Sequence, residues 1–364
     1  MGAAASGELP TNIRRVVLTE PNEDITKAKI VVEEVPMPIP RSGEVLIKVS
    51  AAPVNPSDYG EWSNVIADKE FKPTPVGKEG SGIVIASGGG VYANSIVGCK
   101  IGFVTNVKGQ GSYAEYCTVN ALEGTFPLPE AVPVENAASH FVNPYTAFGF
   151  LDIVKARHRS TKHRPALVHT AAASQLGQML VKLCKQEDVT LINVVRRQDQ
   201  ADILKSIGAN EEHIIVSSGD DWKNHLATTL KTHGVELGFD AVAGEMSGIL
   251  LDALPHKGTL FVYGRLSNQG CSGIQPLDLI YRQKKLEGFY LGSWIKQGGP
   301  LAMLQRIRAA TACVHAGLVD ESGWAASQFA DCSVEAMWTD FVAMWKDNGF
   351  TNKKLRIRFD APTK

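Results

Sequence analysis

The 364-residue sequence lacks any apolar run of about 18 residues, the length at which a helix spans a bilayer. It also has almost no net charge, −1 at pH 7, and its lysines and arginines are scattered among acidic residues rather than gathered in a basic stripe. We therefore expect no transmembrane segment and no nucleic-acid partner. The content of 44% hydrophobic and 21% charged residues is that of an ordinary globular chain, long enough for two domains.

Closely spaced metal ligands are also lacking. No C-x-x-C pair occurs, and the nine histidines form no cluster with the six cysteines, which are Cys99, Cys117, Cys184, Cys271, Cys313 and Cys332. The sequence thus predicts no metal site and reduced thiols, as in a protein of the cytoplasm.

The N-terminal sequence "MGAAAS" fits the myristoylation pattern M-G-x-x-x-[ST], with Gly2 as the acceptor and Ser6 in place. A flexible tail of small residues explains the same letters, and no second membrane signal accompanies them. A mitochondrial transit peptide is disfavoured because Glu8 interrupts a stretch with few arginines.

The strand and helix patterns divide the chain. Up to about residue 140, short β-branched runs such as "EVLIKVSAAPV" alternate with Gly, Pro, Asn and Ser. From about 145, strands such as "ALVHT" and "TLINVV" alternate with amphipathic helices, which indicates a parallel sheet. The segment after about 300 contains two helices and the strand-like "KKLRIRF".

The stretch "HTAAASQLGQ" connects the strand "ALVHT" to a helix with one apolar stripe, Leu176, Met179, Leu180, Leu183 and Cys184. A strand followed directly by a helix N-terminus is the geometry that binds phosphate. Alanines replace the usual glycines, Ser174 can donate a hydroxyl or cap the helix, and Gly177 stands where close packing requires it. Alone, the stretch fits a phosphate loop and a plain helix start equally well.

The next strand, "LINVV", ends in Arg196 and Arg197, with Asn193 just before them. An NAD site usually carries an acidic residue about 20 residues after the loop, whereas an NADP site has arginine near the 2′-phosphate. Guanidinium groups match phosphate geometry, so the pair favours NADPH over a plain solvated turn.

The order of motifs resembles the medium-chain dehydrogenase/reductase superfamily, in particular its zinc-free quinone oxidoreductase and enoyl reductase branches. The resemblance extends from about Arg15 to Phe359 and is carried by "PRSGEVLIKVSAAPVNPSD", "PVGKEGSGIVIASG", "GSYAEYCTV", "VNPYTAFGFL", "HTAAASQLGQMLVKL", "INVVRR" and "GTLFVYG". It implies an α/β chain with a GroES-like β-barrel domain (1–144 and 300–364) and a Rossmann domain with a doubly wound parallel sheet (145–299). In this superfamily the active site lies between the two domains.

Zinc alcohol dehydrogenases are similar but need ligands that are absent here. Their catalytic cysteine corresponds to Asn55 and their histidine to Lys78, neither of which is a usual zinc ligand. Their structural four-cysteine lobe is missing as well, since Cys99 is the only cysteine in that region.

Without zinc, the resemblance implies hydride transfer from NADPH to a quinone or α,β-unsaturated carbonyl. It places the candidate catalytic residues Asn55, Tyr59 and Thr146 near the nicotinamide. Tyr59 is either a proton donor or a packed aromatic, and Lys353 or Lys354 either reaches the cofactor phosphates or is solvated. The expected cofactor-binding residues are Asn143, Ala173, Ser174, Gln175, Leu176, Gly177, Asn193, Arg196, Arg197, Ala243, Gly244, Tyr263, Gly264 and Arg265.

Two other functions fit the sequence. The segment "INVVRR" looks most like the mitochondrial enoyl thioester reductases, but no tyrosine follows Tyr59 in the stretch where they carry their catalytic one. The chain also fits a non-catalytic NADPH-binding sensor or structural protein, because the loop has lost two glycines. A homodimer is expected by analogy with the superfamily alone.

Overall fold

The computed structural model describes residues 9–63, 71–105, 110–159, 164–347 and 351–359, except for the Tyr59 side chain. Gly2 and Ser6 lie outside these residues. The chain divides into two compact units, Met1–Val142 with Ala326–Lys364, and Asn143–Ala325. We call them the β-rich unit and the parallel-sheet unit.

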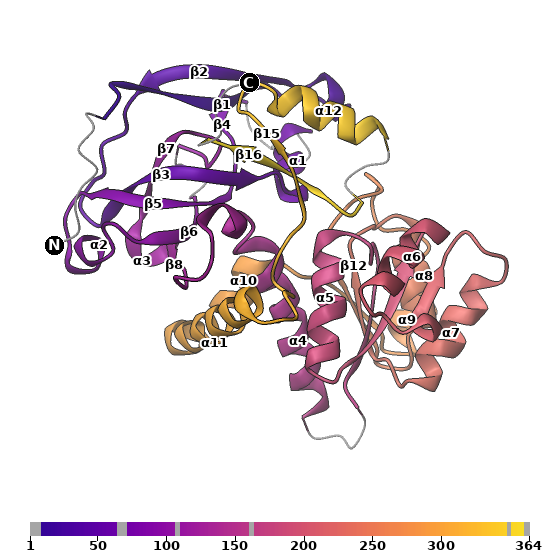
Figure 1. Cartoon of the computed structure of the whole chain (residues 1–364). Helices are drawn as coiled ribbons and strands as arrows, with labels where there is room; N and C mark the ends of the chain where they lie inside the picture. Colours follow the sequence, from indigo (N-terminus) through magenta and orange to yellow (C-terminus); the bar gives the residue numbers. More distant parts are fainter. Residues whose placement is uncertain (1–8, 64–70, 106–109, 160–163, 348–350, 360–364) are drawn as a thin grey trace. The chain divides into compact units, whose positions relative to one another are not determined.

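The β-rich unit contains two sheets (Figure 1). A seven-stranded sheet has the order β15-β16-β3-β5-β6-β8, with β7 paired to β3, and a three-stranded sheet has the order β2-β1-β4. The strands are β1 (Asn12–Glu20), β2 (Lys29–Pro36), β3 (Glu44–Pro53), β4 (Thr74–Pro75), β5 (Glu79–Ser87), β6 (Lys100–Val104), β7 (Tyr116–Asn120), β8 (Thr125–Pro127), β15 (Phe329–Cys332) and β16 (Lys354–Arg358). The helices are η1 (Ile25–Lys27), α1 (Pro56–Trp62), α2 (Val91–Ser95), α3 (Ala121–Gly124), η2 (Val134–Ala137) and α12 (Met337–Asp347).

Strand β16 brings the end of the chain beside β3. The two strands are antiparallel, with Arg356 opposite Pro53 and Ile357 opposite Ala52. The register continues past the strand end, because the Val54 N–H donates to the Leu355 carbonyl. One residue beyond this pair, Lys354 therefore lies opposite Asn55.

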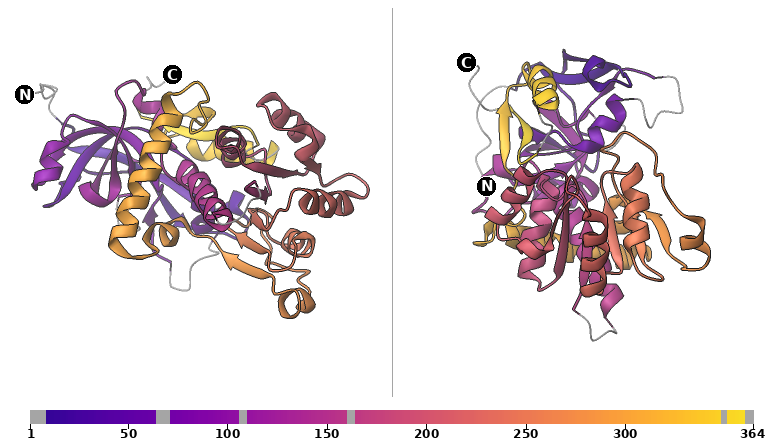
Figure 2. Two further views of the ribbon diagram at one scale, coloured as in Figure 1. Left: turned by 90° about the horizontal axis from the view of Figure 1, so that it is seen from below. Right: turned by 90° about the vertical axis from the view of Figure 1, so that its right-hand side faces the viewer.

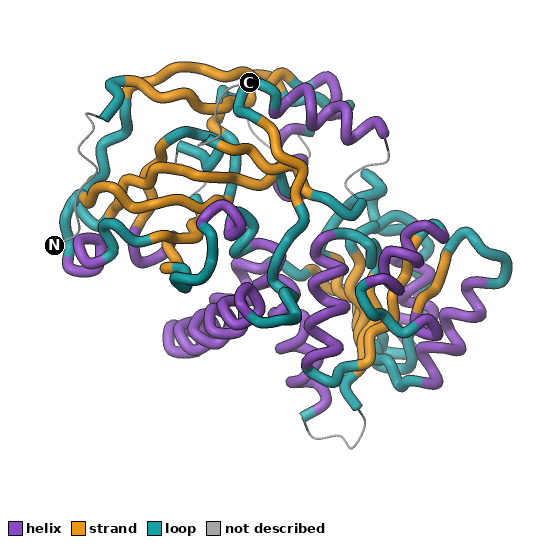
Figure 3. Tube along the Cα trace, viewed as in Figure 1, coloured by secondary structure: helices purple, strands orange, loops and turns teal. Residues whose placement is uncertain are grey.

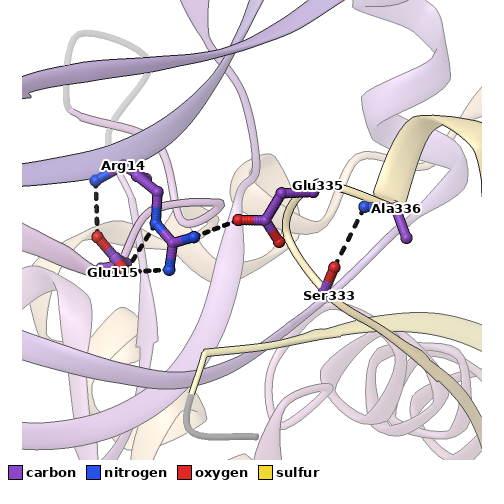
Figure 4. A network of polar contacts seen from close by, with 5 residues as sticks. All are labelled: Arg14, Glu115, Ser333, Glu335 and Ala336. Carbon is purple, nitrogen blue, oxygen red and sulfur yellow. Dashed lines mark hydrogen bonds and ion pairs between the residues drawn. The ribbon is translucent and has the colours of Figure 1, made fainter. Parts of the chain in front are cut away.

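The C-terminal segment of the β-rich unit is also held by charge (Figure 4). The Arg14 guanidinium on β1 donates to Glu115, with Nη2 2.6 Å from Oε1, and also to Glu335 just before α12. Close by, the Ala336 N–H donates to the Ser333 hydroxyl at 3.3 Å. One side chain thus connects the first strand to two later segments of the chain.

The parallel-sheet unit has one six-stranded parallel sheet, in the order β11-β10-β9-β12-β13-β14. Helices cover both of its faces (Figures 2 and 3), so the predicted doubly wound sheet is confirmed. The strands are β9 (Ala166–His169), β10 (Thr190–Val195), β11 (Ile214–Val216), β12 (Leu237–Asp240), β13 (Thr259–Val262) and β14 (Lys285–Gly288). The helices are α4 (Val142–His158), α5 (Gln175–Gln186), α6 (Gln198–Ser206), η3 (Glu211–His213), α7 (Trp222–Thr232), α8 (Glu245–Ala253), α9 (Pro276–Ile280), α10 (Leu291–Lys296) and α11 (Gly299–Val319).

The position of α11 differs from the predicted domain boundary. The sequence groups residues 300–364 with the β-rich domain, whereas α11 belongs to the parallel-sheet unit, which continues to Ala325. The Tyr145 hydroxyl on α4 bonds the Thr311 hydroxyl at 2.6 Å, and Arg306 donates to the Trp294 carbonyl at 2.8 Å. The apolar spacing of a helix predicts that one face is buried but does not say which unit buries it.

Two further predictions can be compared with the described residues. None of their helices is long and apolar enough to cross a membrane. All six cysteines are free thiols, as expected.

Candidate active site

The N-terminus of α5 is built around Ser174 and Gly177. Ser174 is the N-cap, and its hydroxyl accepts a hydrogen bond from the Gly177 N–H at 3.2 Å. Of the two roles open to it from sequence, the structure thus shows the helix cap. The remaining first-turn N–H groups, of Gln175 and Leu176, belong to the helix end at which the macrodipole favours an anion.

Gly177 is required by close packing. A Cβ at this position would overlap the Ala172 carbonyl oxygen and lie 2.8 Å from the Ala172 Cα. The turn before it reverses tightly, since Ala171 has a φ of 51°, in the left-handed region that favours glycine. Ala173 is 2% exposed. The alanine-rich stretch therefore makes the same tight strand-to-helix connection as a glycine loop, with some backbone strain at Ala171.

The two arginines after β10 differ in their partners. Arg197 donates from Nε and Nη2 to both oxygens of Asp199, each at 2.9 Å, and this bond lowers the pKa of the Asp199 carboxyl. Arg196 is exposed, and its guanidinium has no hydrogen bond or ion pair with any described residue. Arg196 is therefore the better placed to receive an external phosphate.

Asn193, which the sequence predicts beside the cofactor, lies in the interior. It is 2% exposed; its Oδ1 lies 2.8 Å from His169 Nε2, and its Nδ2 donates to the Leu191 carbonyl. Burial lowers the pKa of His169 to about 4, so its ring is neutral at pH 7. All six residues of β10 are buried, and the Asn193 side chain is bonded to His169 at the end of the neighbouring β9.

The carboxyl ends of β12 and β13 carry the other predicted cofactor residues. Ala243 and Gly244 both have a φ of 61° and form the turn into α8. A Cβ on Gly264 would lie 2.8 Å from the Ala241 carbonyl oxygen. Arg265 is exposed and bonds Asn268. Burial raises the pKa of the Tyr263 phenol, and its oxygen has no hydrogen-bond partner in the described structure.

Asp240 was not predicted from the sequence, although its carboxylate connects the turns at this edge of the sheet. The carboxylate is fully buried and accepts from the Val242 and Ala243 N–H groups at 2.8 and 3.1 Å. It also accepts from the hydroxyls of Thr170 and Ser247 at 2.8 and 2.7 Å. Four donors satisfy the buried charge and fix the turns after β9 and β12.

A shallow depression of about 520 Å³, largely open to solvent, lies at the same edge of the parallel-sheet unit. Ala243 and Gly244 line it together with Trp222 and Met246, which sequence reasoning did not select. This position agrees with the rule that ligands of open α/β sheets bind outside the carboxyl ends of the strands.

In the β-rich unit, Asn55 is the centre of a buried polar cluster. It is 1% exposed; its Nδ2 donates to Glu79 Oε1 at 2.8 Å, and its Oδ1 accepts from Lys354 Nζ at 2.7 Å. Lys354 also donates to the Ser139 hydroxyl at 3.0 Å. Glu79 Oε2 accepts from the backbone N–H groups of residues 141 and 142 at 3.0 and 2.8 Å.

Lys354 is the most unexpected member of this cluster. The sequence predicts that Lys354 either contacts the cofactor phosphates or is solvated. In the structure its side chain is only 4% exposed and is bonded to Asn55. Burial lowers its pKa to about 8, although Glu79 and Asp58 act in the opposite direction. Lys353, next to it, is exposed. Lys353 precedes β16, whereas Lys354 is the first residue of this strand, and the first four residues of the strand are all buried.

Helix α1, which follows Asn55, starts with a reciprocal cap. The Asn55 N–H donates to Asp58 Oδ2 and the Asp58 N–H to the Asn55 carbonyl. The Tyr113 hydroxyl donates to the same Asp58 oxygen at 2.8 Å, while burial raises the pKa of Asp58 to about 6. Tyr59 lies in α1, but its side chain is outside the described part of the structure.

The positions that correspond to zinc ligands are engaged otherwise. Asn55 is bonded as above, and Lys78 Nζ donates to the Ser57 carbonyl at 2.6 Å and pairs with Glu61 at 3.0 Å. The described residues contain no group of three or more His, Cys, Asp or Glu that could hold a metal ion. In the parallel-sheet unit, Asn143 and Thr146 lie in the first two turns of α4 and are each 8% exposed.

Comparisons with known proteins agree with this architecture. Residues 41–130 match the alcohol dehydrogenase GroES-like domain, and residues 176–307 match the zinc-binding dehydrogenase domain. The mitochondrial enoyl-[acyl-carrier-protein] reductase of Caenorhabditis elegans is 29% identical over 70% of this chain and 71% of its own. Mouse prostaglandin reductase-3 is 28% identical over 79% of this chain and 75% of its own.

Solved structures that are similar to this chain also agree with this architecture. A Mesorhizobium loti protein assigned as an NADPH:quinone reductase has a TM-score of 0.83 and 28% identity, covering 97% of this chain and 100% of its own. The Escherichia coli quinone oxidoreductase in complex with NADPH has a TM-score of 0.72 over 95% of this chain and 99% of its own; at 17% identity it supports the fold alone.

A GroES-like β-rich domain combined with a Rossmann sheet defines a two-domain dehydrogenase. The chain belongs to the medium-chain dehydrogenase/reductase superfamily, and the solved structures it resembles include quinone oxidoreductases. The predicted fold class is therefore confirmed.

Proposed function

We propose that the protein is a zinc-independent, NADPH-dependent oxidoreductase that reduces a quinone or an α,β-unsaturated carbonyl compound. The observation that carries the proposal is the unpaired Arg196 guanidinium at the end of β10, next to the helix terminus formed by Ser174 and Gly177. The Mesorhizobium loti protein, assigned as an NADPH:quinone reductase, supports the same reaction.

The residues of the parallel-sheet unit fit NADPH. The start of α5 offers N–H groups and a tight turn to a pyrophosphate, and Arg196 offers a bidentate donor to the 2′-phosphate. The buried Tyr263 hydroxyl lacks a partner among the described residues, as expected of a group that bonds a ligand. When bound, NADPH supplies the hydride. Arg197 contributes less, because Asp199 already occupies its guanidinium.

The protein's part in the reaction is to orient and to stabilise charge. Hydride addition to the β-carbon of an unsaturated carbonyl sends an electron pair to the carbonyl oxygen, and a proton must then reach the α-carbon. In this proposal the Asn55 amide donates a hydrogen bond to the developing oxyanion, in place of a Lewis-acidic metal. No buried acid is needed if water supplies the proton.

Two measurements test the proposal together. Equilibrium titration should give tighter binding for NADPH than for NADH, and equal affinities would remove Arg196 from the site. NADPH consumption should then be followed with 1,4-quinones, 2-alkenals and enoyl-CoA esters. Tight binding without turnover on any acceptor would instead favour the NADPH-binding sensor or structural protein.

Enoyl thioester reduction is the second candidate, because the Caenorhabditis elegans relative is an enoyl-[acyl-carrier-protein] reductase. In this reading Tyr59, from α1, donates the proton. Tyr59→Phe should lower the rate with enoyl-CoA esters by about 100-fold, the usual contribution of a general acid. An unchanged rate would exclude Tyr59 as the acid.

A homodimer through the parallel sheet is part of the proposal. Strand β14 is an edge of the sheet, and exposed apolar side chains lie close to it in sequence: Leu277, Ile280 and Tyr281 are 62%, 63% and 74% exposed. Exposed edges and apolar surface favour association. Sedimentation analysis should give a dimer mass, and Ile280→Asp should shift it towards the monomer.

The N-terminus and the location in the cell also remain proposals. We propose a cytoplasmic protein with Gly2 as a myristoylation acceptor, although several relatives are mitochondrial enzymes. Mass spectrometry of the N-terminal peptide from the native host should show a myristoyl adduct on Gly2. Cleavage of the first residues, together with a mitochondrial signal from a C-terminally tagged chain, would refute both statements.

A further inference from the structure

The buried cluster around Asn55 contains a lysine whose role the reaction scheme above does not explain. Lys354 lies 4% exposed on β16, and its ammonium is 2.7 Å from the Asn55 side-chain oxygen. Burying an ammonium is unfavourable unless it is paired and hydrogen-bonded. The hydrogen-bond partners of the Lys354 ammonium, Asn55 and Ser139, are both neutral. A simple ion pair therefore does not explain why this lysine is buried.

The chemistry of the three side chains fixes the orientation of the amide. A lysine ammonium can only donate and an ionised glutamate can only accept. Asn55 must therefore present its oxygen to Lys354 and its nitrogen to Glu79, and a flipped amide would place donor against donor and acceptor against acceptor. Glu79 is itself held by the N–H groups of residues 141 and 142.

This arrangement leaves one hydrogen on the Asn55 nitrogen without a partner among the described residues, because Glu79 takes only the other. The charge on Lys354 also polarises the amide, since a cation at the oxygen withdraws electron density from the nitrogen and strengthens its N–H as a donor.

We propose that Lys354 is a positioning residue that orients and polarises the Asn55 amide, so that the second Nδ2 hydrogen is a fixed donor to the acceptor's developing oxyanion. The proposal rests on the proposed function for the role of Asn55, but the locked orientation of the amide does not. The charged groups that face Lys354 are Glu79 from β5 and Asp58 from α1.

The first experiment measures the amide directly, without any acceptor. In protein labelled with ¹⁵N-asparagine, the Asn55 side-chain signals are identified as those missing in Asn55→Asp. The two Nδ2 hydrogens should be widely separated in shift and should move with a midpoint near pH 8 as Lys354 deprotonates. In Lys354→Met, which keeps the length of the side chain, this pH-dependent movement should be absent. The same movement in Lys354→Met would overturn the proposal.

The second experiment separates positioning from folding. Lys354→Met should lower kcat about tenfold with the best acceptor while the Kd of NADPH stays within twofold, and Lys354→Arg should recover part of the loss because it keeps the charge. Lys48→Met, an exposed lysine on β3 of the same sheet, is the matched control and should leave kcat unchanged.

The possible outcomes are distinct. If Lys354→Met does not fold, Lys354→Arg and the pH titration of the wild-type amide still decide the question. An unchanged kcat in Lys354→Met, with unchanged Asn55 signals, would overturn the proposal. The protein could show the predicted pH-dependent Asn55 signals and yet turn over no acceptor. This result would refute the proposed function and the catalytic role of Asn55, but not the contact between Lys354 and the Asn55 amide.

Discussion

At the scale of single residues, the two arginines after β10 show why neighbours with the same chemistry are not equivalent. Arg197 is half-buried and already bonded to both oxygens of Asp199, whereas Arg196 is exposed and has no partner among the described residues. A ligand phosphate has to compete with the Asp199 carboxylate for Arg197, but only with water for Arg196.

Arg196→Ala should therefore weaken NADPH binding by about 10- to 100-fold, the loss of one charge-assisted hydrogen-bonded contact. Arg197→Ala should weaken it by only about threefold. NADH affinity, measured in the same fluorescence titration, should change little in either variant because it lacks the 2′-phosphate. A larger effect from Arg197→Ala would contradict the assignment.

Asp58 should make stability depend on pH. Its pKa is about 6 in the folded chain, against an ordinary value of 3.8. Between these values the folded state retains a proton that the unfolded state has lost, so stability falls as pH rises from about 4 to about 6. The difference corresponds to about 3 kcal/mol at most.

Asp58→Asn removes this titration. Urea unfolding should show the variant gaining stability relative to wild type as pH rises from 4 to 7. Asp347→Asn, an exposed carboxylate at the end of α12 in the same unit, should show no such trend. A constant difference between Asp58→Asn and wild type would mean that Asp58 ionises normally.

At the scale of elements, the packing of α5 on the preceding turn depends on Gly177. Gly177→Ala should destabilise the protein by about 1–3 kcal/mol, because the new Cβ would overlap the Ala172 backbone. NADPH affinity should fall with it, since the same turn forms the helix terminus. Gly270→Ala is the control: nothing lies within 4 Å of its Cβ, and its effect on thermal unfolding should be small.

The elements that the sequence predicted best are those with a strong local pattern. The run "TLINVV" coincides with β10, and the five residues of the predicted stripe on α5 are all buried. β14 was not predicted, because its four residues, "KLEG", are mainly polar and three of them are exposed at a sheet edge. Periodicity identifies an element through its buried face, so an exposed edge strand leaves little signal.

The sequence predicted some residues of the candidate site and missed others, for a similar reason. Ser174, Gly177 and Arg196 follow one another closely along the chain, and their spacing alone suggests a phosphate site. Lys354 contacts Asn55 across 299 residues, and Asp240 binds a turn that follows another strand. Such long-range pairs depend on sheet order and strand register, which local spacing does not contain.

At the scale of the whole molecule, the candidate cofactor residues belong to one of the two compact units. NADPH should therefore slow amide hydrogen exchange mainly in residues 166–186 and 190–197, and the effect on β1 and β2 should be small. Exchange followed by mass spectrometry, with and without NADPH at about 100 times its Kd, tests this. Equal protection of both units would point to a different binding site.

The pairing of β16 with β3 also has a consequence for how the protein is made. Asn55 leaves the ribosome early, but Lys354, the residue that we propose fixes its amide, follows 299 residues later. The Asn55 amide therefore cannot be held by Lys354 while the parallel-sheet unit, residues 143–325, is being synthesised. A chain that stops before Lys354 would lack β16, the strand that joins β15 to β3, and no lysine would hold its Asn55 amide.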